Sequence, residues 1–244
     1  MKQILVTAVF VTALGVFDSA SAQPQPFVAV NGVYQATSTS FGDTKTFRLN
    51  AEDARFETDY EVKGGPAIDV AGGAFLWHRL GFGVGVTRFT HSTPAIVSAS
   101  IPHPFFFSRP RSIAGDAGGF SREELALHLQ ARALLPLTGK IQAMAFGGPS
   151  FFRVSQKLTT NVRYAEAYPF DVATFQGVDS TSAEESRIGF NVGADVEYFF
   201  MRRIGVGGTV QFSRASVDLP SASGSTVSVD AGGAQVGAGI RLRF

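Results

Sequence analysis

The stretch RIGFNVGADVEY, residues 187–198, alternates between two kinds of side chain at every position. Its even-numbered residues are all apolar, whereas its odd-numbered residues are Arg, Gly, Asn, Gly, Asp and Glu. Successive side chains of a β-strand point to opposite faces, and no helical register separates the two sets in this way. The stretch therefore predicts a strand with one apolar face and one polar face.

The same alternation recurs along the chain. In residues 235–244 the side chains of Val236, Ala238, Ile240, Leu242 and Phe244 share one face, and Gln, Gly and Arg occupy the other. Further strands are predicted at residues 27–36, 66–77, 80–86, 140–152 and 204–213. Several such strands at regular spacing favour an all-β fold.

Residues 123–137, EELALHLQARALLPL, fit two structures. Their Leu, Ala and Glu content favours a helix, on which Glu124, His128 and Arg132 would share a face. Gln130 shares a face with these three residues only in a strand, where every second side chain points the same way. A row of Leu and Ala occupies the positions between them. We therefore predict a strand here, and about eight strands in all.

The N-terminal segment has its own pattern. A charged start precedes an apolar run at residues 4–17 and the small residues Ala20 and Ala22, as is typical of a secretory signal peptide. A transmembrane anchor would need about 20 apolar residues, and Asp18 interrupts the run before that length. We expect residues 1–22 to be removed, and residues 23–244 to form one exported domain.

The remaining chain has no stretch that is long and apolar enough for a transmembrane helix, so it can cross a membrane only as a closed barrel. Short joins near His78, Thr138 and Arg202 alternate with long polar stretches at residues 41–61, 94–121 and 157–185 and a shorter one at residues 220–226. This layout predicts a closed antiparallel transmembrane β-barrel with short periplasmic turns and long extracellular loops. In a soluble barrel the apolar rows would point inward, and lone charges would be buried without water around them.

The composition excludes several function classes. The chain has no Cys, so it forms neither disulfides nor thiolate metal sites. Its formal net charge of +1 gives no reason to expect nucleic acid as a partner. No phosphate-binding glycine motif or metal-spaced His/Asp cluster is present, because the 27 glycines largely alternate within strands. We expect no cofactor and no metal.

At this point the chain resembles the small outer-membrane β-barrel proteins of Gram-negative-type bacteria. The most specific match is at the end of the chain, where Gly239, Leu242 and Phe244 are similar to the C-terminal signal that the barrel assembly machinery reads. Leu242 replaces the aromatic residue that is usual there. The resemblance implies a location in the bacterial outer membrane. It also implies contact with outer-membrane lipids, including lipopolysaccharide, and with the barrel assembly machinery.

The polar face of the strands would line the lumen. An eight-stranded barrel is just wide enough for side chains to fill it, and mixed acids and bases there neutralise one another. We therefore expect a salt-bridged network, and a narrow porin-like channel for small solutes is the alternative. The residues predicted to form the lumen network are Glu124, His128, Gln130, Arg132, Asn191, Asp195, Glu197, Arg241 and Arg243.

Two groups of residues are candidates for contacts outside the barrel. Arg88 and Arg214 fall on the lipid-facing phase at the expected outer headgroup level, where they would meet lipopolysaccharide phosphates unless a bulge turns them away. The second outer loop contains an aromatic cluster between prolines and basic residues, which suggests a surface contact with an acidic partner. Alternatively, its rings fold over the barrel mouth or dip into the outer leaflet. The loop candidates are Phe105, Phe106, Phe107, Arg109 and Arg111.

Catalysis has weaker support. His91 with Ser92 and His103 with Asp116 are the candidate pairs for nucleophilic or general-base chemistry, but their spacing alone fixes no catalytic geometry. We expect a protein that is not an enzyme and that has a structural or surface-binding role through its extracellular loops. The porin-like channel is the second hypothesis, and a lipid-modifying enzyme is the third.

Overall fold

The computed structural model describes residues 24–77, 79–137, 140–221, 224 and 226–244. The predicted signal peptide and the turn residues His78 and Thr138 lie outside the described residues. The strands are β1 (Gln25–Gln35), β2 (Thr39–Leu49), β3 (Glu52–Val62), β4 (Gly65–Trp77), β5 (Leu80–Ile101), β6 (Arg111–Pro136), β7 (Ile141–Glu166), β8 (Ala173–Phe199), β9 (Ile204–Pro220) and β10 (Thr226–Arg243). No helix among the described residues has the length and hydropathy needed to cross a membrane.

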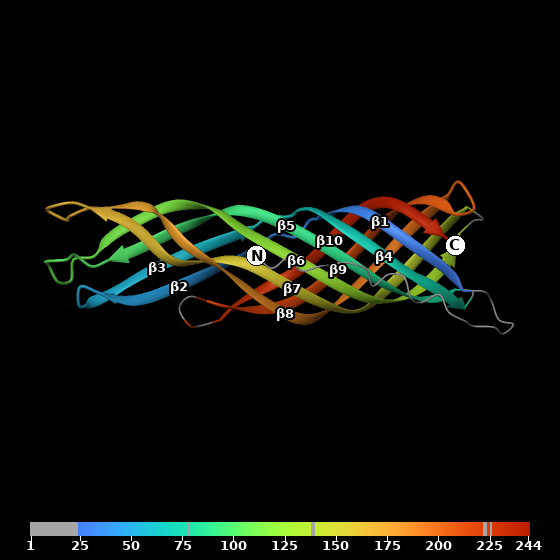
Figure 1. Ribbon diagram of the computed structural model, residues 1–244, viewed down its shortest axis with the longest axis horizontal. Helices are drawn as coiled ribbons and strands as arrows, with labels where there is room; N and C mark the ends of the chain where they lie inside the picture. Colours follow the sequence, from blue (N-terminus) through green and yellow to red (C-terminus); the bar gives the residue numbers. More distant parts are fainter. Residues whose placement is uncertain (1–23, 78, 138–139, 222–223, 225) are drawn as a thin grey trace, which may run out of the picture.

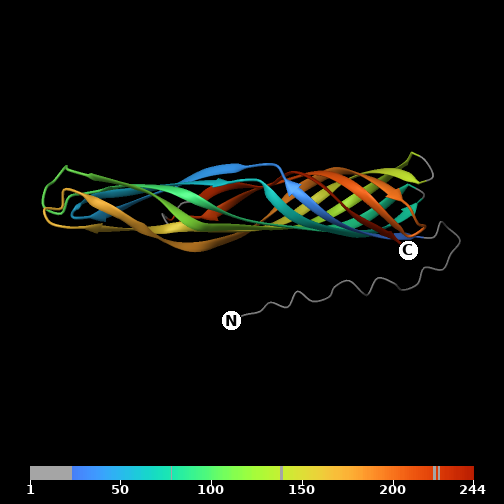
Figure 2. The same cartoon turned by 90° about the horizontal axis from the view of Figure 1, so that it is seen from above.

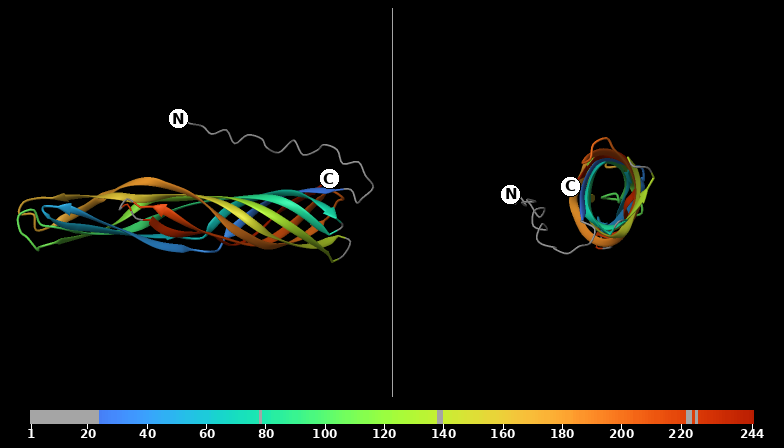
Figure 3. Two further views of the ribbon diagram at one scale, coloured as in Figure 1. Left: turned by 90° about the horizontal axis from the view of Figure 1, so that it is seen from below. Right: turned by 90° about the vertical axis from the view of Figure 1, so that its right-hand side faces the viewer.

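Strands β1 and β4 to β10 form a closed antiparallel ring (Figure 1). Each strand pairs with its neighbours in the order β4-β1-β10-β9-β8-β7-β6, and β5 closes the ring by pairing with both β4 and β6. Viewed along its long axis, the ring of strands is elliptical (Figure 3). The predicted fold class is confirmed, and so is the prediction of a strand rather than a helix at residues 123–137, which lie mostly in β6.

The stretches predicted to be long loops are mostly strands. Residues 41–61 contain the β2–β3 hairpin, in which Thr39 pairs with Val62 and Leu49 with Glu52. Residues 94–121 and 157–185 continue β5 and β6, and β7 and β8, so the barrel extends far to one side (Figures 1 and 2). The outward side chains of these strands are mostly polar, and in the sequence a polar stretch of this length predicts a loop. We call this part, beyond Arg88 on β5, the stalk.

The pairing of the ring is incomplete in the stalk. Pairing between β6 and β7 begins at Arg122 and Gln156, and pairing between β8 and β9 ends at Phe190 and Arg214. Beyond these points β2, β3, β5 and β6 form one sheet, whereas β7 and β8 form one hairpin and β9 and β10 another. The stalk is therefore held together by its interior as well as by its strand pairing.

Strand β9 shows how the polarity of the barrel wall reverses at the base of the stalk. Its outward side chains are first Ile204, Val206, Val210 and Phe212 and then Arg214, Ser216 and Asp218. Its inward side chains are first Thr209, Gln211 and Ser213 and then Ala215, Val217 and Leu219. An apolar exterior around a polar interior is typical of a transmembrane barrel, and the reverse is typical of a soluble sheet. Strand β9 thus passes from one environment to the other without changing phase, whereas β6 changes phase at a bulge near Gly119, between the buried residues Ala117 and Phe120.

Candidate functional site

The lumen near the start of β1 and the end of β10 contains a buried ion-pair cluster. The Arg241 guanidinium donates to both carboxylate oxygens of Asp195, at 2.5 and 3.3 Å, and lies 3.4 Å from Glu197. Glu197 also accepts from Arg243 at 2.8 Å. The side chains of Arg241, Asp195 and Glu197 are at least nine-tenths buried. Four of the predicted lumen residues therefore share one cluster.

A hydrogen-bond chain leads from this cluster along the lumen. Arg241 donates to Asn31, which donates to Asp69, and Thr87 donates to the other carboxylate oxygen of Asp69. Thr87 in turn lies 3.2 Å from Nε2 of His128. The sequence analysis missed Asn31, Asp69 and Thr87, although their phase in the predicted strands at residues 27–36 and 66–77, and beside residues 80–86, marks them as inward.

His128 is the centre of a second group. Its Nδ1 lies 2.7 Å from the Ser150 hydroxyl, and its Nε2 lies 3.2 Å from Gln211. Asn191 donates to Ser150. A serine at this distance from a histidine suggests a nucleophile and its base, but both side chains are completely buried. They have no surface on which a substrate could bind, so the contact is structural.

Arginines close the two ends of this polar region. Arg132 donates twice to Gln130, and its guanidinium lies over the rings of Phe27 and Phe146, at 4.5 and 5.1 Å from their centroids. Towards the stalk, Arg122 donates to Glu124 at 2.6 Å, and both are buried. Arg122 falls on the predicted lumen phase but was not among the predicted residues, because the proposed strand began one residue later.

The interior of the stalk is an apolar core. Side chains from its strands pack into one buried cluster, whose largest members are Phe56, Tyr60, Phe120, Phe152 and Leu158. Tyr60 on β3 accepts a hydrogen bond from the backbone N–H of Thr159 on β7 at 2.7 Å, which joins the two layers of the stalk. Burial raises the pKa of the Tyr60 hydroxyl. The interior thus passes from a polar network in the barrel to an apolar core in the stalk.

The exterior changes from apolar to charged where the stalk begins. Arg88 lies 2.8 Å from Glu123, and Arg214 lies 2.7 Å from Asp230, with all four side chains solvent-exposed. Arg153 forms a further ion pair on the same face. The structure therefore places both predicted arginines on the exterior, each paired with a carboxylate on the neighbouring strand.

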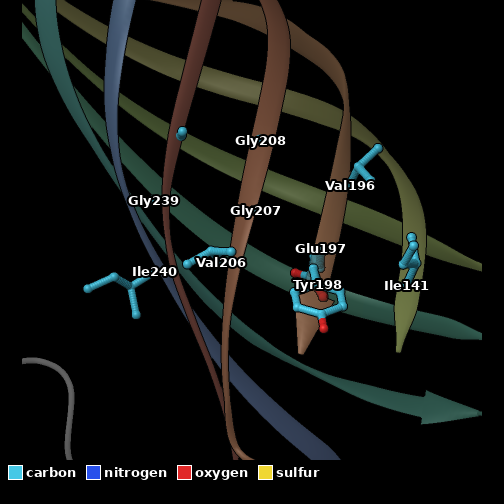
Figure 4. A pocket seen from close by; sticks show the side chains of 10 residues that line it. Ile141, Val196, Glu197, Tyr198, Val206, Gly207, Gly208, Gly239 and Ile240 are labelled. Atoms are coloured by element: carbon cyan, nitrogen blue, oxygen red, sulfur yellow. The ribbon is translucent and has the colours of Figure 1, made fainter. Parts of the chain in front are cut away.

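A shallow depression on the apolar exterior lies over β7, β8, β9 and β10 (Figure 4), and another lies over β6, β7 and β8 around Leu127, Phe151 and Ile188. In the first depression, Gly208 pairs with Val196 on β8 and with Ala238 on β10. Because Gly208 and Ala238 are both small and lie side by side, the surface is lower there than around them. This depression is lined mainly by apolar side chains such as Tyr198 and Ile240. It lies within the wall that a lipid chain would contact.

The far end of the stalk carries a cluster of exposed aromatic side chains, here named the aromatic tip. It consists of the β5–β6 turn, residues 102–110, and the β7–β8 turn, residues 167–172, which lie side by side (Figures 1 and 2). Phe105, Phe106, Phe107 and Tyr168 are 68%, 55%, 75% and 85% exposed. The rings of Phe105 and Phe170 meet edge to face at 5.5 Å and join the two turns.

The two arginines of this turn have different positions. Arg111 is buried, and it donates to Glu166 at 2.5 Å and to the carbonyl oxygens of Pro102 and Phe170 at 3.0 Å. The expectation that Arg111 meets an acidic partner is therefore wrong, because its guanidinium is used to clamp the two turns together. Arg109 remains exposed and lies 3.3 Å from Asp171.

His103 holds the tip from within. Its ring is buried, and Nδ1 accepts the backbone N–H groups of Phe105 at 3.1 Å and Phe106 at 3.3 Å. Nε2 must then carry the proton, and it points towards Asp171 at 3.9 Å. A metal ion at Nε2 would require the opposite tautomer and would break both backbone hydrogen bonds. His103 thus acts on the shape of the turn.

The candidate catalytic pairs are not assembled. His103 lies in the turn that precedes β6. Asp116 lies within β6, where it pairs with Ile96, and it is five positions beyond Arg111, the first residue of that strand. At roughly 3.3 Å per residue this separates them by about 17 Å. His91 and Ser92 are consecutive in β5, so their side chains point to opposite faces.

The C-terminal strand closes the ring against β1. Leu242 pairs with Val28, and the N–H of Phe244 donates to the carbonyl oxygen of Pro26 at 3.0 Å, which leaves the Phe244 ring exposed at the rim. A Cβ at Gly239 would lie 1.8 Å from the carbonyl oxygen of Val30. Only glycine permits this close approach of β10 to β1.

No protein-family model matches the chain, and no curated protein matches it in sequence. Among solved structures, Neisserial surface protein A has 12% sequence identity and a TM-score of 0.48, covering 90% of this chain and 97% of its own. The outer membrane protein OprG from Pseudomonas aeruginosa has 12% identity and a TM-score of 0.49, covering 90% and 95%. Ail, the attachment invasion locus protein of Yersinia pestis, has 10% identity and a TM-score of 0.36, covering 91% of this chain and 100% of its own.

The geometry of the chain itself defines its class. Eight antiparallel strands close into a ring, apolar side chains cover the outside of one half, and a hydrogen-bonded polar network fills the inside of that half. These are the features by which a sheet crosses a bilayer. The chain has the architecture of the small outer-membrane β-barrel proteins.

Proposed function

We propose that this protein is anchored in the bacterial outer membrane and binds a partner outside the cell through its aromatic tip. The apolar exterior of the barrel supports the location, because it ends at a row of ion pairs that includes Arg88 and Arg214. Anionic headgroups of outer-membrane lipids, including lipopolysaccharide, would contact this row. The exposed rim residue Phe244, with Gly239 and Leu242, would be read by the barrel assembly machinery.

The observation that carries the binding role is the exposure of a braced aromatic cluster. Four large aromatic side chains project from the end of the stalk, and the turns that carry them are held by Arg111 and His103. On the surfaces of soluble proteins, exposed apolar clusters of this kind mark interaction sites. Because the turns are held in shape before contact, little conformational entropy is lost on binding.

The interior favours this role over that of a channel. Buried side chains of the polar network are followed along the barrel axis by the apolar core of the stalk. We expect the folded protein to show no steady conductance in planar lipid bilayers. Discrete, long-lived conductance that changes with Arg241→Met or His128→Ala would support the channel and argue against a filled lumen.

The binding role is tested by surface display. Cells that display the protein are compared with cells that display the variant Phe105→Ser/Phe107→Ser, for adhesion to immobilised matrix glycoprotein, to sulfated glycan and to supported lipid bilayers. Adhesion to at least one surface should depend on the two phenylalanines. The variant Ile96→Ser is the control, because Ile96 is 62% exposed on the wall of the stalk, away from the tip. Equal adhesion by all three proteins on every surface would refute the role.

A further inference from the structure

We infer that the partner of the aromatic tip is the surface of a neutral lipid bilayer outside the cell, and this inference rests on the proposed binding role. The tip lies at the end of the long axis of the molecule, with no part of the described chain beyond it (Figures 1 and 2). From Arg88 to Ile101, β5 extends about 40 Å at roughly 3.3 Å per residue. The rings are therefore remote from the membrane that holds the barrel.

The backbone of the β5–β6 turn offers few free N–H donors. Pro102, Pro104 and Pro110 have no N–H group. The N–H groups of Phe105 and Phe106 are accepted by His103. The remaining hydrogen bonds of the turn that the structure shows are the Ser108 N–H to Glu52 at 2.8 Å and the carbonyl of Pro102 to Arg111. A turn with few free N–H groups costs less to bring into the boundary of a lipid bilayer than a turn that offers many donors, which would suit a protein or glycan partner better.

The charges of the tip are matched in pairs. Arg109 lies 3.3 Å from Asp171, and Arg111 lies 2.5 Å from Glu166. Glu52, which accepts the Ser108 N–H, adds a carboxylate beside these pairs, so the tip presents no excess positive charge that would select an acidic partner. Phenylalanine rings beside a neutral polar rim suit the boundary between headgroups and acyl chains of an uncharged bilayer.

The tip presents only four exposed aromatic side chains, so one copy would bind weakly. A few inserted rings give an interaction comparable to a single weak lipid anchor. Many copies on one cell surface would act together and raise the overall affinity without any new contact. We therefore expect lipid binding to be strong for cells or particles that carry many copies and weak for single barrels.

Fluorescence quenching tests the insertion directly. The chain has one tryptophan, Trp77, in β4 at the opposite end of the barrel. The protein is placed in nanodiscs as Trp77→Phe/Phe107→Trp, and phosphatidylcholine vesicles with brominated acyl chains are added. The tryptophan introduced at the tip should be quenched and shifted to shorter wavelength, equally at low and high salt. The matched control, Trp77→Phe/Ile96→Trp, should not respond.

Partitioning gives the magnitude. In particles that carry many barrels, Phe105→Ser should reduce binding to neutral vesicles about tenfold, because one phenylalanine ring no longer moves from water into the bilayer. Ile96→Ser should leave binding unchanged. Absence of quenching, together with tip-dependent adhesion to glycoprotein or glycan, would overturn the lipid partner and leave the binding role intact. Association of particles without vesicles would identify a second copy as the partner and overturn the inference. Loss of tip dependence on every surface would refute both.

Discussion

The buried ion pairs of the lumen make a quantitative prediction. Arg241→Met removes the guanidinium that contacts Asp195 at 2.5 Å and Glu197 at 3.4 Å. Arg243 still pairs with Glu197, but Asp195 is left 5% exposed with no direct cation. Breaking one partner of a buried ion pair costs about 3–5 kcal/mol, because the remaining charge is uncompensated. We expect the free energy of unfolding to fall by this amount.

The matched control is an ion pair on the outside. Arg214→Met removes a guanidinium that lies 2.7 Å from Asp230, where the two side chains are 55% and 45% exposed. Exposed pairs contribute about 0–1 kcal/mol. The double variant Arg241→Met/Asp195→Leu should recover much of the loss, because it removes the stranded carboxylate.

Urea unfolding in detergent micelles, followed by tryptophan fluorescence and by heat-modifiable gel mobility, measures these differences. Equal destabilisation by Arg241→Met and Arg214→Met would refute the reasoning, since it would mean that water reaches the lumen as freely as the exterior. A double variant that is no more stable than Arg241→Met would show that the stranded charge is not the cause.

Three further predictions concern the wall, the stalk and the tip. Val210→Arg should destabilise the barrel in bilayers by about 2–4 kcal/mol, whereas Ser216→Arg, on the same face of β9 beyond the polarity reversal, should change stability by less than about 0.5 kcal/mol. Tyr60→Phe should cost about 1–3 kcal/mol in the stalk, since the N–H of Thr159 loses its acceptor. Folding raises the pKa of Tyr60, so above a pH of about 10 the hydroxyl ionises more readily in the unfolded state and wild-type stability should fall. Part of this fall should be absent from Tyr60→Phe. Urea titrations at several pH values measure the difference. His103→Ala should speed chymotrypsin cleavage within residues 102–110 and leave the heat-modifiable mobility unchanged; an unchanged cleavage rate would argue against its bracing role.

The lumen residues show what a local pattern can predict. Asp195 and Glu197 were assigned to the inside from their phase alone, and both are buried there, because the direction of a strand side chain depends only on its position in the strand. The same signal continues into the stalk, where Arg214, Ser216 and Asp218 alternate with apolar residues. The alternation does not indicate a membrane strand there, because the apolar row lies on the inside.

The aromatic tip shows the limit of such patterns. Arg109 and Arg111 differ by two positions and are chemically identical, yet one is exposed and the other is buried. Their difference depends on Glu166 and Phe170, which the pairing of β7 with β8 brings to the same end of the barrel. No feature near Arg111 in the sequence indicates these contacts.

The sequence by itself determined the strands of the membrane half, the direction of their side chains and the class of barrel, since the two-residue period of a strand is a local property and a bilayer accepts only one arrangement of it. The tertiary structure alone decided where the polarity of the wall reverses, how the lumen ions are paired and which tip residues are exposed. Those features depend on contacts between distant residues, such as Arg241 with Asn31 and Tyr60 with Thr159. The register of neighbouring strands sets such contacts, and register is a property of the closed sheet as a whole.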